Sequence, residues 1–211
     1  MTTLLPQGDR RSARLLPLTL GYDNDIECPG NFGGEWKPGS FCRRHRNFEH
    51  SDNYRFDRRE NAGLRRKLKV GLAYWLSYYQ HGLCRWSLQG EGLRCPWDSV
   101  EVAGILIWTD KPSNLGAKTY DARARDARSY LEEYTDWCNG HCYWFSLEQD
   151  SLTPVTCGGF IGTEHLTEAI NEALAGGDQV SVAGEAASLA RRLKLKVAIR
   201  DTTAHRHEPQ A

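Results

Sequence analysis

Cysteine and histidine side chains gather in two short segments whose shared chemistry would be zinc binding. The segment Cys138-Asn139-Gly140-His141-Cys142 holds three potential ligands within five residues, and Cys42 and His45 form a second pair. Structural zinc sites usually combine two ligand pairs with a spacing such as C-x2-C, and neither segment has that spacing. We therefore expect no bound metal and interpret the cysteines as buried thiols of a reducing compartment, with zinc as the alternative. The chain has seven cysteines, an odd number: Cys28, Cys42, Cys84, Cys95, Cys138, Cys142 and Cys157.

A second set of polar side chains could act as acids, bases or metal ligands. The segment Cys95-Pro96-Trp97-Asp98 would present its aspartate on a turn stiffened by proline. The structural alternative is favoured: Asp98 would accept backbone N–H bonds within this turn. Cys95 and Trp97 would then belong to the core, and His81 to a hairpin. The candidate polar cluster is His81, Asp98 and Asp136, accompanied by His45, Cys95 and Cys157.

Standard catalytic strings do not occur in the chain. It has no Walker loop, no G-x-S-x-G, no H-E-x-x-H, no G-x-G-x-x-G and no deaminase H-x-E with C-x-x-C. Catalytic groups can converge from distant segments, so this absence reduces the expectation of an enzyme without excluding one. A binding function is therefore favoured over catalysis, and no cofactor is expected.

Arginine clusters mark the N-terminal third of the chain. Residues 1–70 hold 14 basic and 9 acidic side chains, whereas residues 71–211 hold 13 and 18. Arginine binds phosphate and carboxylate groups through paired hydrogen bonds, so the clusters could face an anionic partner. The alternative is a solvated surface, because acidic residues alternate with the clusters and no aromatic stacking platform lies beside them. The candidate partner-binding residues are Arg43, Arg44, His45, Arg46, Arg58, Arg59, Arg65 and Arg66.

The charge and the apolar runs limit the choice of partners. A formal net charge of zero argues against a protein that coats nucleic acid and against an acidic mimic of DNA, so direct nucleic-acid binding is not favoured. The longest apolar run, Val102–Trp108, is too short to cross a bilayer, and no membrane contact is expected. The segment Met1–Leu20 carries charged residues where a signal peptide would be apolar, so we expect a cytoplasmic protein.

Several elements must position these side chains. Val70–Tyr79 is apolar on both alternating faces, as in a buried central strand, and Cys84–Leu88 would be the second arm of its hairpin. Apolar residues recur every three to four positions in Lys118–Thr135, which predicts an amphipathic helix. Pro17 confines the strand Leu15–Leu20 to a sheet edge or a strand start. The other predicted elements are the strand Val100–Thr109, a hairpin of Cys142–Leu147 with Val155–Ile161, helices over Arg55–Lys69 and Glu164–Leu174, and either a helix in Ser181–Lys196 or a strand in Leu193–Ile199.

The order of these elements predicts an α+β fold. Strands outnumber helices and their hairpin spacings favour antiparallel pairing, so we expect one antiparallel sheet covered on one face by two or three helices. A long Gly- and Pro-rich loop over Tyr22–Ser40 would precede most of the sheet. We expect residues 1–14 to be a flexible N-terminus, residues 15–200 a single α+β domain and residues 201–211 a flexible tail.

Four ordered blocks resemble a known family. The blocks are Tyr74–Gly82, Arg94–Ser99, Tyr134–Tyr143 and Thr156–Gly162, and in this order they resemble an uncharacterised family carried by bacteriophages and plasmids. The segment Cys42–Arg46 is similar to that family's first block, although the residues that follow it are displaced. The family usually has an Asp where His141 stands. The family has no assigned reaction, so the resemblance implies a context: a small accessory protein of a mobile element inside a bacterial cell.

Two function classes remain open. The first is a protein that acts by binding and inhibits a host antiphage defence complex, for example as an anti-CRISPR protein. Its partner would be a host or phage protein, including one within a nucleoprotein complex. The second is a small metal-dependent enzyme that acts on nucleic acid or nucleotides. Sensitivity to EDTA would separate them, because a contact inhibitor is indifferent to metal removal.

Overall fold

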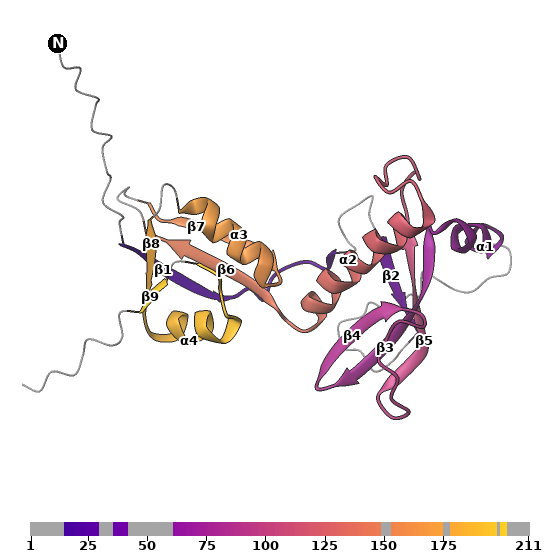
Figure 1. Cartoon of the computed structure of the whole chain (residues 1–211), viewed down its shortest axis with the longest axis horizontal. Helices are drawn as coiled ribbons and strands as arrows, with labels where there is room; N and C mark the ends of the chain where they lie inside the picture. Colours follow the sequence, from indigo (N-terminus) through magenta and orange to yellow (C-terminus); the bar gives the residue numbers. More distant parts are fainter. Residues whose placement is uncertain are drawn as a thin grey trace, which may run out of the picture. The chain divides into compact units, whose positions relative to one another are not determined.

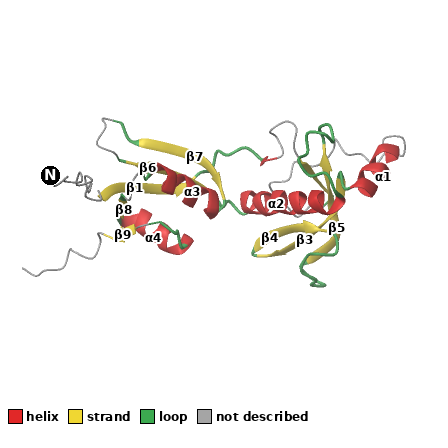
Figure 2. Cartoon of the chain, turned by 45° about the horizontal axis from the view of Figure 1, so that its top comes forward, coloured by secondary structure: helices red, strands yellow, loops and turns green. Residues whose placement is uncertain are grey.

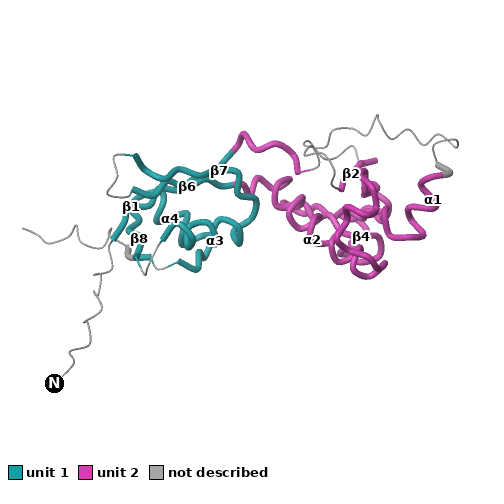
Figure 3. Tube along the Cα trace, turned by 90° about the horizontal axis from the view of Figure 1, so that it is seen from above, with its two compact units in different colours: residues 1–23, 143–211 teal, residues 24–142 magenta. Residues whose placement is uncertain are grey.

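The chain folds into two compact units. The computed structural model describes residues 15–29, 36–41, 61–148, 153–174, 178–197 and 199–201. Unit 1 is formed by residues 1–23 and 143–211, and unit 2 by residues 24–142, as Figure 3 shows. The chain therefore leaves unit 1 after its first strand, builds unit 2, and returns. Residues 15–200, expected as a single domain, thus contain two compact units, each with a sheet of its own.

Unit 1 is built on a five-stranded sheet of order β7-β6-β1-β8-β9 (Figure 1). Strand β1 runs antiparallel to β6 but parallel to β8, and β8 runs parallel to β9, so the sheet is mixed. The parallel pairs depart from the all-antiparallel sheet that the sequence predicts, and β8 is joined to β9 through a helix, as neighbouring parallel strands require. Its elements are β1 (Leu15–Tyr22), β6 (Cys142–Leu147), β7 (Val155–Ile161), α3 (Thr163–Ala173), β8 (Gln179–Val182), α4 (Gly184–Leu193) and β9 (Ile199–Asp201).

Pro17 lies in a central strand rather than at an edge. Strand β1 has β6 on one side and β8 on the other, so the edge position expected for Pro17 is wrong. The Pro17 carbonyl accepts a hydrogen bond from the N–H of Glu148, the residue just after β6. In a strand the N–H and C=O of one residue point to the same side, so the missing proline donor falls at the very end of the β1–β6 ladder. Pro17 is the third residue of β1, just before the β1–β6 register begins at Leu18, and so lies near the strand start that was the alternative expectation.

Both helices of unit 1 cover the same face of its sheet. Alternate residues of β1 are buried, and they share one apolar cluster with Phe145 of β6, Ile170 of α3 and Leu189 of α4. On the opposite face Gly21 lies directly across from Trp144, and a Cβ at Gly21 would lie 2.8 Å from the indole Nε1. The indole therefore covers the glycine, as aromatic residues often do across a sheet.

Unit 2 is built on a four-stranded antiparallel sheet of order β2-β5-β3-β4. Helix α2 lies along β4 on one face, as Figure 2 shows, and its apolar side packs on Leu76, Trp86 and Leu106. Leu64 and Leu68 of α1 pack on the other face. The elements are β2 (Trp36–Ser40), α1 (Asn61–Val70), β3 (Ala73–His81), β4 (Leu83–Leu88), β5 (Ser99–Trp108) and α2 (Tyr120–Cys138).

Most predicted elements are present, and the α+β class is confirmed. Strand β3 is central and covered on both faces, which explains why its sequence is apolar on both alternations. Strands β6 and β7 are neighbours, and Ser146 contacts Thr156 across them through a 2.8 Å hydrogen bond, as the predicted hairpin requires. The predicted helix Arg55–Lys69 is observed as α1, and residues 55–60 lie outside the described residues.

Three details of the sequence prediction change. The described part of the chain forms two sheets where one was expected. Within the predicted loop Tyr22–Ser40, Trp36–Ser40 forms the edge strand β2, while residues 30–35 lie outside the described part of the chain. Residues 179–201 form a strand, a helix and a strand in succession, where the sequence predicted a helix or a strand alone. No helix in the described ranges is long and apolar enough to span a membrane.

Candidate functional site

The segment Leu93–Ser99, called here the Trp97 turn, is held by its own hydrogen bonds. The Ser99 hydroxyl donates to the Leu93 carbonyl at 2.6 Å and accepts from the Cys95 N–H at 2.9 Å. The Ser99 N–H in turn donates to the Cys95 carbonyl at 3.0 Å. Pro96 fixes one backbone dihedral inside this loop. The short segment between β4 and β5 is therefore a preorganised turn.

Trp97 projects from this turn into solvent. Its side chain is 84% exposed, which corrects the expectation that Trp97 is a core residue. Leu93, at the start of the turn, is 54% exposed. A pocket of about 450 Å³ lies beside the turn, lined in part by Leu93, Arg94, Pro96 and Val100. A largely exposed tryptophan in the same turn as a second exposed apolar residue is a feature of contact surfaces.

Gly92 lets the chain that leads into this turn pass close to two serine side chains. A Cβ at Gly92 would lie 2.5 Å from the Ser87 Oγ and 2.7 Å from the Ser77 Oγ. These two hydroxyls are themselves 3.0 Å apart and bonded to each other across β3 and β4. The loop after β4 can therefore close over the serine pair only with glycine at this position.

Asp98 ties the turn to the tip of the β3–β4 hairpin. Its Oδ2 lies 3.2 Å from Nδ1 of His81 and accepts a hydrogen bond from the Cys95 Sγ at 3.4 Å. The Asp98 carbonyl also accepts from the Gln80 N–H at 2.9 Å. The structure thus brings together His81, Asp98 and Cys95 of the predicted polar cluster. The partners of the Asp98 carboxylate in this arrangement are side chains, where the sequence led us to expect backbone N–H groups.

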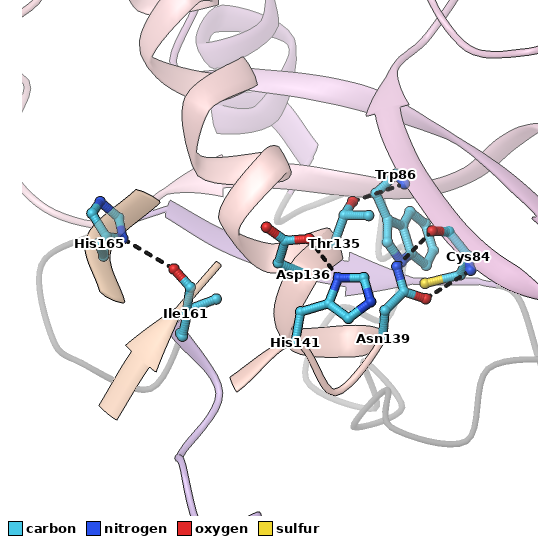
Figure 4. Close-up of polar contacts among 8 residues, drawn as sticks. All are labelled: Cys84, Trp86, Thr135, Asp136, Asn139, His141, Ile161 and His165. Atoms are coloured by element: carbon cyan, nitrogen blue, oxygen red, sulfur yellow. Dashed lines mark hydrogen bonds and ion pairs between the residues drawn. The ribbon is translucent and has the colours of Figure 1, made fainter. Parts of the chain in front are cut away.

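Asp136, the third member of the predicted polar cluster, pairs instead with His141. The Asp136 Oδ1 lies 2.9 Å from Nδ1 of His141, and the His141 N–H donates to the Asp136 carbonyl at 2.9 Å (Figure 4). Both side chains are partly exposed, at 35% for His141 and 40% for Asp136. When His141 is neutral and donates from Nδ1, its Nε2 remains an acceptor. A carboxylate that orients an imidazole in this way is an arrangement used by general bases.

The end of α2 is fastened to β4 by two polar side chains. Asn139 accepts a hydrogen bond from the Cys84 N–H at 2.8 Å and donates one to the Cys84 carbonyl at 2.9 Å. Thr135 accepts from the Trp86 N–H at 3.1 Å, as Figure 4 shows. Residues four apart on a helix are separated by about 6 Å, and residues two apart on a strand by about 6.7 Å. The two spacings match, so a helix can bind alternate residues of an edge strand.

Sequence reasoning missed the role of Thr135 and Asn139. The Asn139-Gly140 pair was interpreted only as a turn, and Thr135 was assigned no contact. The available signal was a polar pair four residues apart in an otherwise amphipathic helix, on the stripe that also carries the buried Leu131 and Cys138. Such a pattern indicates polar contacts at the helix interface but does not name their partner.

The structure describes three of the residues named for the zinc alternative: Cys138, His141 and Cys142. Cys138 lies in the apolar core of unit 2, and Cys142 begins strand β6. Within the described ranges no three His, Cys, Asp or Glu side chains are placed to hold a metal ion. Burial raises the pKa of the Cys138 thiol well above its ordinary value, which keeps it protonated. Cys42 and His45 lie outside the described residues.

The predicted arginine patch is described only in part. Arg65 and Arg66 are exposed on α1, whereas Lys67 donates from Nζ to the Trp108 carbonyl at 2.8 Å. Desolvation by burial lowers the pKa of Lys67, so within this basic run Lys67 differs in environment from the exposed Arg65 and Arg66. The other candidates lie outside the described residues: Arg43, Arg44, His45, Arg46, Arg58 and Arg59.

No protein-family model, no curated protein and no solved structure matches this chain.

Proposed function

We propose that this chain is an accessory protein of a mobile genetic element that acts by binding, and that it inhibits a host antiphage defence complex such as a CRISPR effector. The proposal places it in the cytoplasm of the bacterial host. Its partner is a host or phage protein, alone or within a nucleoprotein complex. The observation that supports this proposal is the exposed indole of Trp97 on a hydrogen-bonded turn.

The Trp97 turn has the physical properties of a binding hot spot. Tryptophan and arginine are enriched among the residues that dominate protein interfaces, and Arg94 lies in the same turn. A turn that is already held by hydrogen bonds loses little conformational freedom on binding, so more of the contact energy remains for affinity. The expected partner surface is an apolar pocket that accepts an indole and is flanked by an acidic group that pairs with Arg94.

The first experiment captures partners of the tagged chain from phage-infected or plasmid-bearing cells and identifies them by mass spectrometry. Affinity of the purified partner is then measured for the wild type and for Trp97→Ala, with Leu83→Ala as the matched control. Leu83 is also an exposed apolar side chain, at 59%, but lies outside the turn. Loss of a hot-spot residue is expected to weaken binding by roughly 30-fold or more. The control should bind as the wild type does.

A defence assay then tests the biological half of the proposal. Phage plating on a host with an active CRISPR system should rise when the wild type is expressed and should not rise with Trp97→Ala. Equal binding and equal plating by the two proteins would refute the role of the Trp97 turn. A partner that belongs to no defence complex would refute the inhibitory function and leave the contact surface intact.

The Asp136–His141 pair supports a second candidate, the small metal-dependent enzyme acting on nucleic acid or nucleotides. A partly exposed imidazole held by a carboxylate could remove a proton from a bound substrate. Hydrolysis of single-stranded DNA, RNA and nucleoside triphosphates should be measured with Mg²⁺ or Mn²⁺, with EDTA, and with His141→Ala. Activity that requires both the metal and His141 would favour the enzyme, and activity unaffected by either would exclude this site.

A further inference from the structure

Two buried cysteines from different elements meet in the core of unit 2. Cys84 of β4 is 5% exposed and Cys138 at the end of α2 is 9% exposed, and both belong to the same apolar cluster. Asn139, the residue after Cys138, bonds to the backbone of Cys84, and the Cys84 thiol and the Tyr134 hydroxyl both affect the pKa of Cys138. All six described cysteines are in the thiol form. The two sulfur atoms are therefore neighbours that no covalent bond joins.

The backbone around these thiols is held in register. Asn139, the residue after Cys138, binds both the N–H and the carbonyl of Cys84, at 2.8 and 2.9 Å. Thr135, four residues before Asn139, binds the N–H of Trp86 at 3.1 Å. These three bonds fix β4 against the last turn of α2 on both sides of the thiol pair. A disulfide demands a particular separation of its two Cα atoms, and rotation of side chains alone can close it only where the backbones are already close.

We infer that Cys84 and Cys138 form an oxidisable dithiol, whose disulfide would fasten β4 covalently to the end of α2. The oxidant is a small-molecule disulfide of the oxidised-glutathione class. One protein thiolate attacks the small disulfide, forms a mixed disulfide and releases one small thiol. The second protein thiol then attacks the protein sulfur of that bond and releases the other small thiol. Two protein S–H groups become one S–S bond, and one small disulfide becomes two small thiols.

Burial controls the rate of this reaction. The thiolate is the attacking species, and the raised pKa of Cys138 makes its thiolate rare at neutral pH. Oxidation should therefore be slow near pH 7 and accelerate as the pH rises. Both sulfurs are also buried, so attack requires transient opening at the end of α2. The pair is expected to persist as thiols in a reducing cell and to oxidise only under sustained disulfide stress.

Cys28 is the competing thiol. It packs against the same cluster, is partly exposed, and lies close enough to influence the ionisation of Cys138 and Tyr134. An external disulfide can reach Cys28 more readily than the buried pair. The assignment to Cys84 rests on its burial in the same cluster as Cys138 and on the backbone bonds that Asn139, the neighbour of Cys138, makes to Cys84 and not to Cys28.

The experiment uses the purified full chain, first reduced and then incubated with oxidised glutathione at pH 8.5. Mass spectrometry of a non-reduced digest should show the Cys84 and Cys138 peptides joined. The disulfide closes a loop of about 55 residues, so the melting temperature should rise by roughly 10 °C and return on addition of dithiothreitol. Cys95→Ser and Cys157→Ser are the matched controls, because they remove partly exposed thiols outside the pair and should keep the rise.

Variants of the buried pair give the decisive comparison. Cys84→Ala and Cys138→Ala can each lower stability, so the measured quantity is the difference between oxidised and reduced melting temperatures within each variant. That difference should vanish in both variants. The inference is overturned when the oxidised wild type carries a Cys28–Cys138 link, or when neither the linked peptide nor the temperature rise is found after complete oxidation of the exposed thiols. These outcomes do not depend on the identity of any binding partner.

Discussion

Asn139 at the end of α2 binds both backbone groups of Cys84 in the edge strand β4, through its Oδ1 at 2.8 Å and its Nδ2 at 2.9 Å. The side-chain amide thus takes the place that a residue of a neighbouring strand would occupy. Thr135 binds the next edge-facing residue, Trp86, through its N–H alone, at 3.1 Å. An uncovered edge strand can pair with another chain, so these helix side chains close one edge of the sheet in unit 2.

Replacing Asn139 tests this closure. Asn139→Ala leaves the N–H and carbonyl of Cys84 without their partner, and the free energy of unfolding should fall by about 2 kcal/mol. Asn139→Asp should recover part of the loss, because a carboxylate accepts from the N–H but cannot donate to the carbonyl. Urea unfolding measures both, with the exposed Ser129→Ala on the same helix as the control. Equal stability of Asn139→Ala and wild type would show that water replaces the amide without loss.

Tyr74 offers a stabilising substitution. Its hydroxyl is buried and has no hydrogen-bond partner among the described residues. A buried polar group without a partner is destabilising, so Tyr74→Phe should raise the free energy of unfolding by about 1 kcal/mol. Thermal unfolding at neutral pH measures this. A loss of stability would show that the hydroxyl has a bound water or another partner.

The same tyrosine should make the folded protein less stable at alkaline pH. Burial raises the pKa of Tyr74 from 10.0 to about 12. Because the folded pKa lies above the unfolded one, the contribution to stability is complete below about pH 10 and is lost as the pH rises through about 12. Melting temperatures measured from pH 8 to 12 should fall less steeply for Tyr74→Phe than for the wild type. Parallel curves would contradict the assignment to Tyr74, and the remaining slope would then belong to other tyrosines such as Tyr134.

The contribution of the Glu91–Arg128 pair to the free energy of unfolding should disappear at acid pH. Arg128 contacts both carboxylate oxygens, at 2.8 and 2.7 Å, and this bonding lowers the pKa of Glu91. Because the folded pKa of Glu91 lies below the unfolded value of about 4.5, the pair stabilises the protein at pH values above 4.5. This stabilisation is lost as the pH falls below that value. Both side chains are more than 40% exposed, so Glu91→Gln should cost only about 0.5 kcal/mol at pH 7. Urea unfolding at pH 7 and pH 3 should show the difference between the two proteins disappearing at the lower pH.

Replacing glycine by alanine should change the stability of the protein in opposite directions at two positions. Gly21→Ala places a methyl group 2.8 Å from the Trp144 indole, which should cost about 1–3 kcal/mol through displacement of the ring. Gly63 lies inside α1 with nothing within 4 Å of its ideal Cβ, so Gly63→Ala should stabilise by about 1 kcal/mol through helix propensity. Melting temperatures measure both changes. A loss at Gly63 would show that its helix is held by contacts other than propensity.

The sequence by itself determined the local elements. The period of apolar residues in α2, the two apolar faces of β3 and the turn residues around β4, β6 and β7 depend on near neighbours in the chain, so they could be recognised without knowledge of the fold. The same holds for the α+β class. Within the candidate site, sequence reasoning selected His81, Asp98 and Asp136, and the structure joined the first two and paired the third with His141.

Only the tertiary structure decided which elements became partners. The parallel pairing of β1 with β8, across some 160 residues of sequence, and the division into two units arise from long-range burial that no local pattern encodes. Trp97 is apolar and would ordinarily be assigned to a core, but its turn bonds hold it in solvent. Asn139 has the chemistry of a turn residue, and its contact with β4 exists because a helical spacing of four residues matches a strand spacing of two. Local chemistry limits what a side chain can do, and the distant chain segment folded against it determines which of those possibilities is realised.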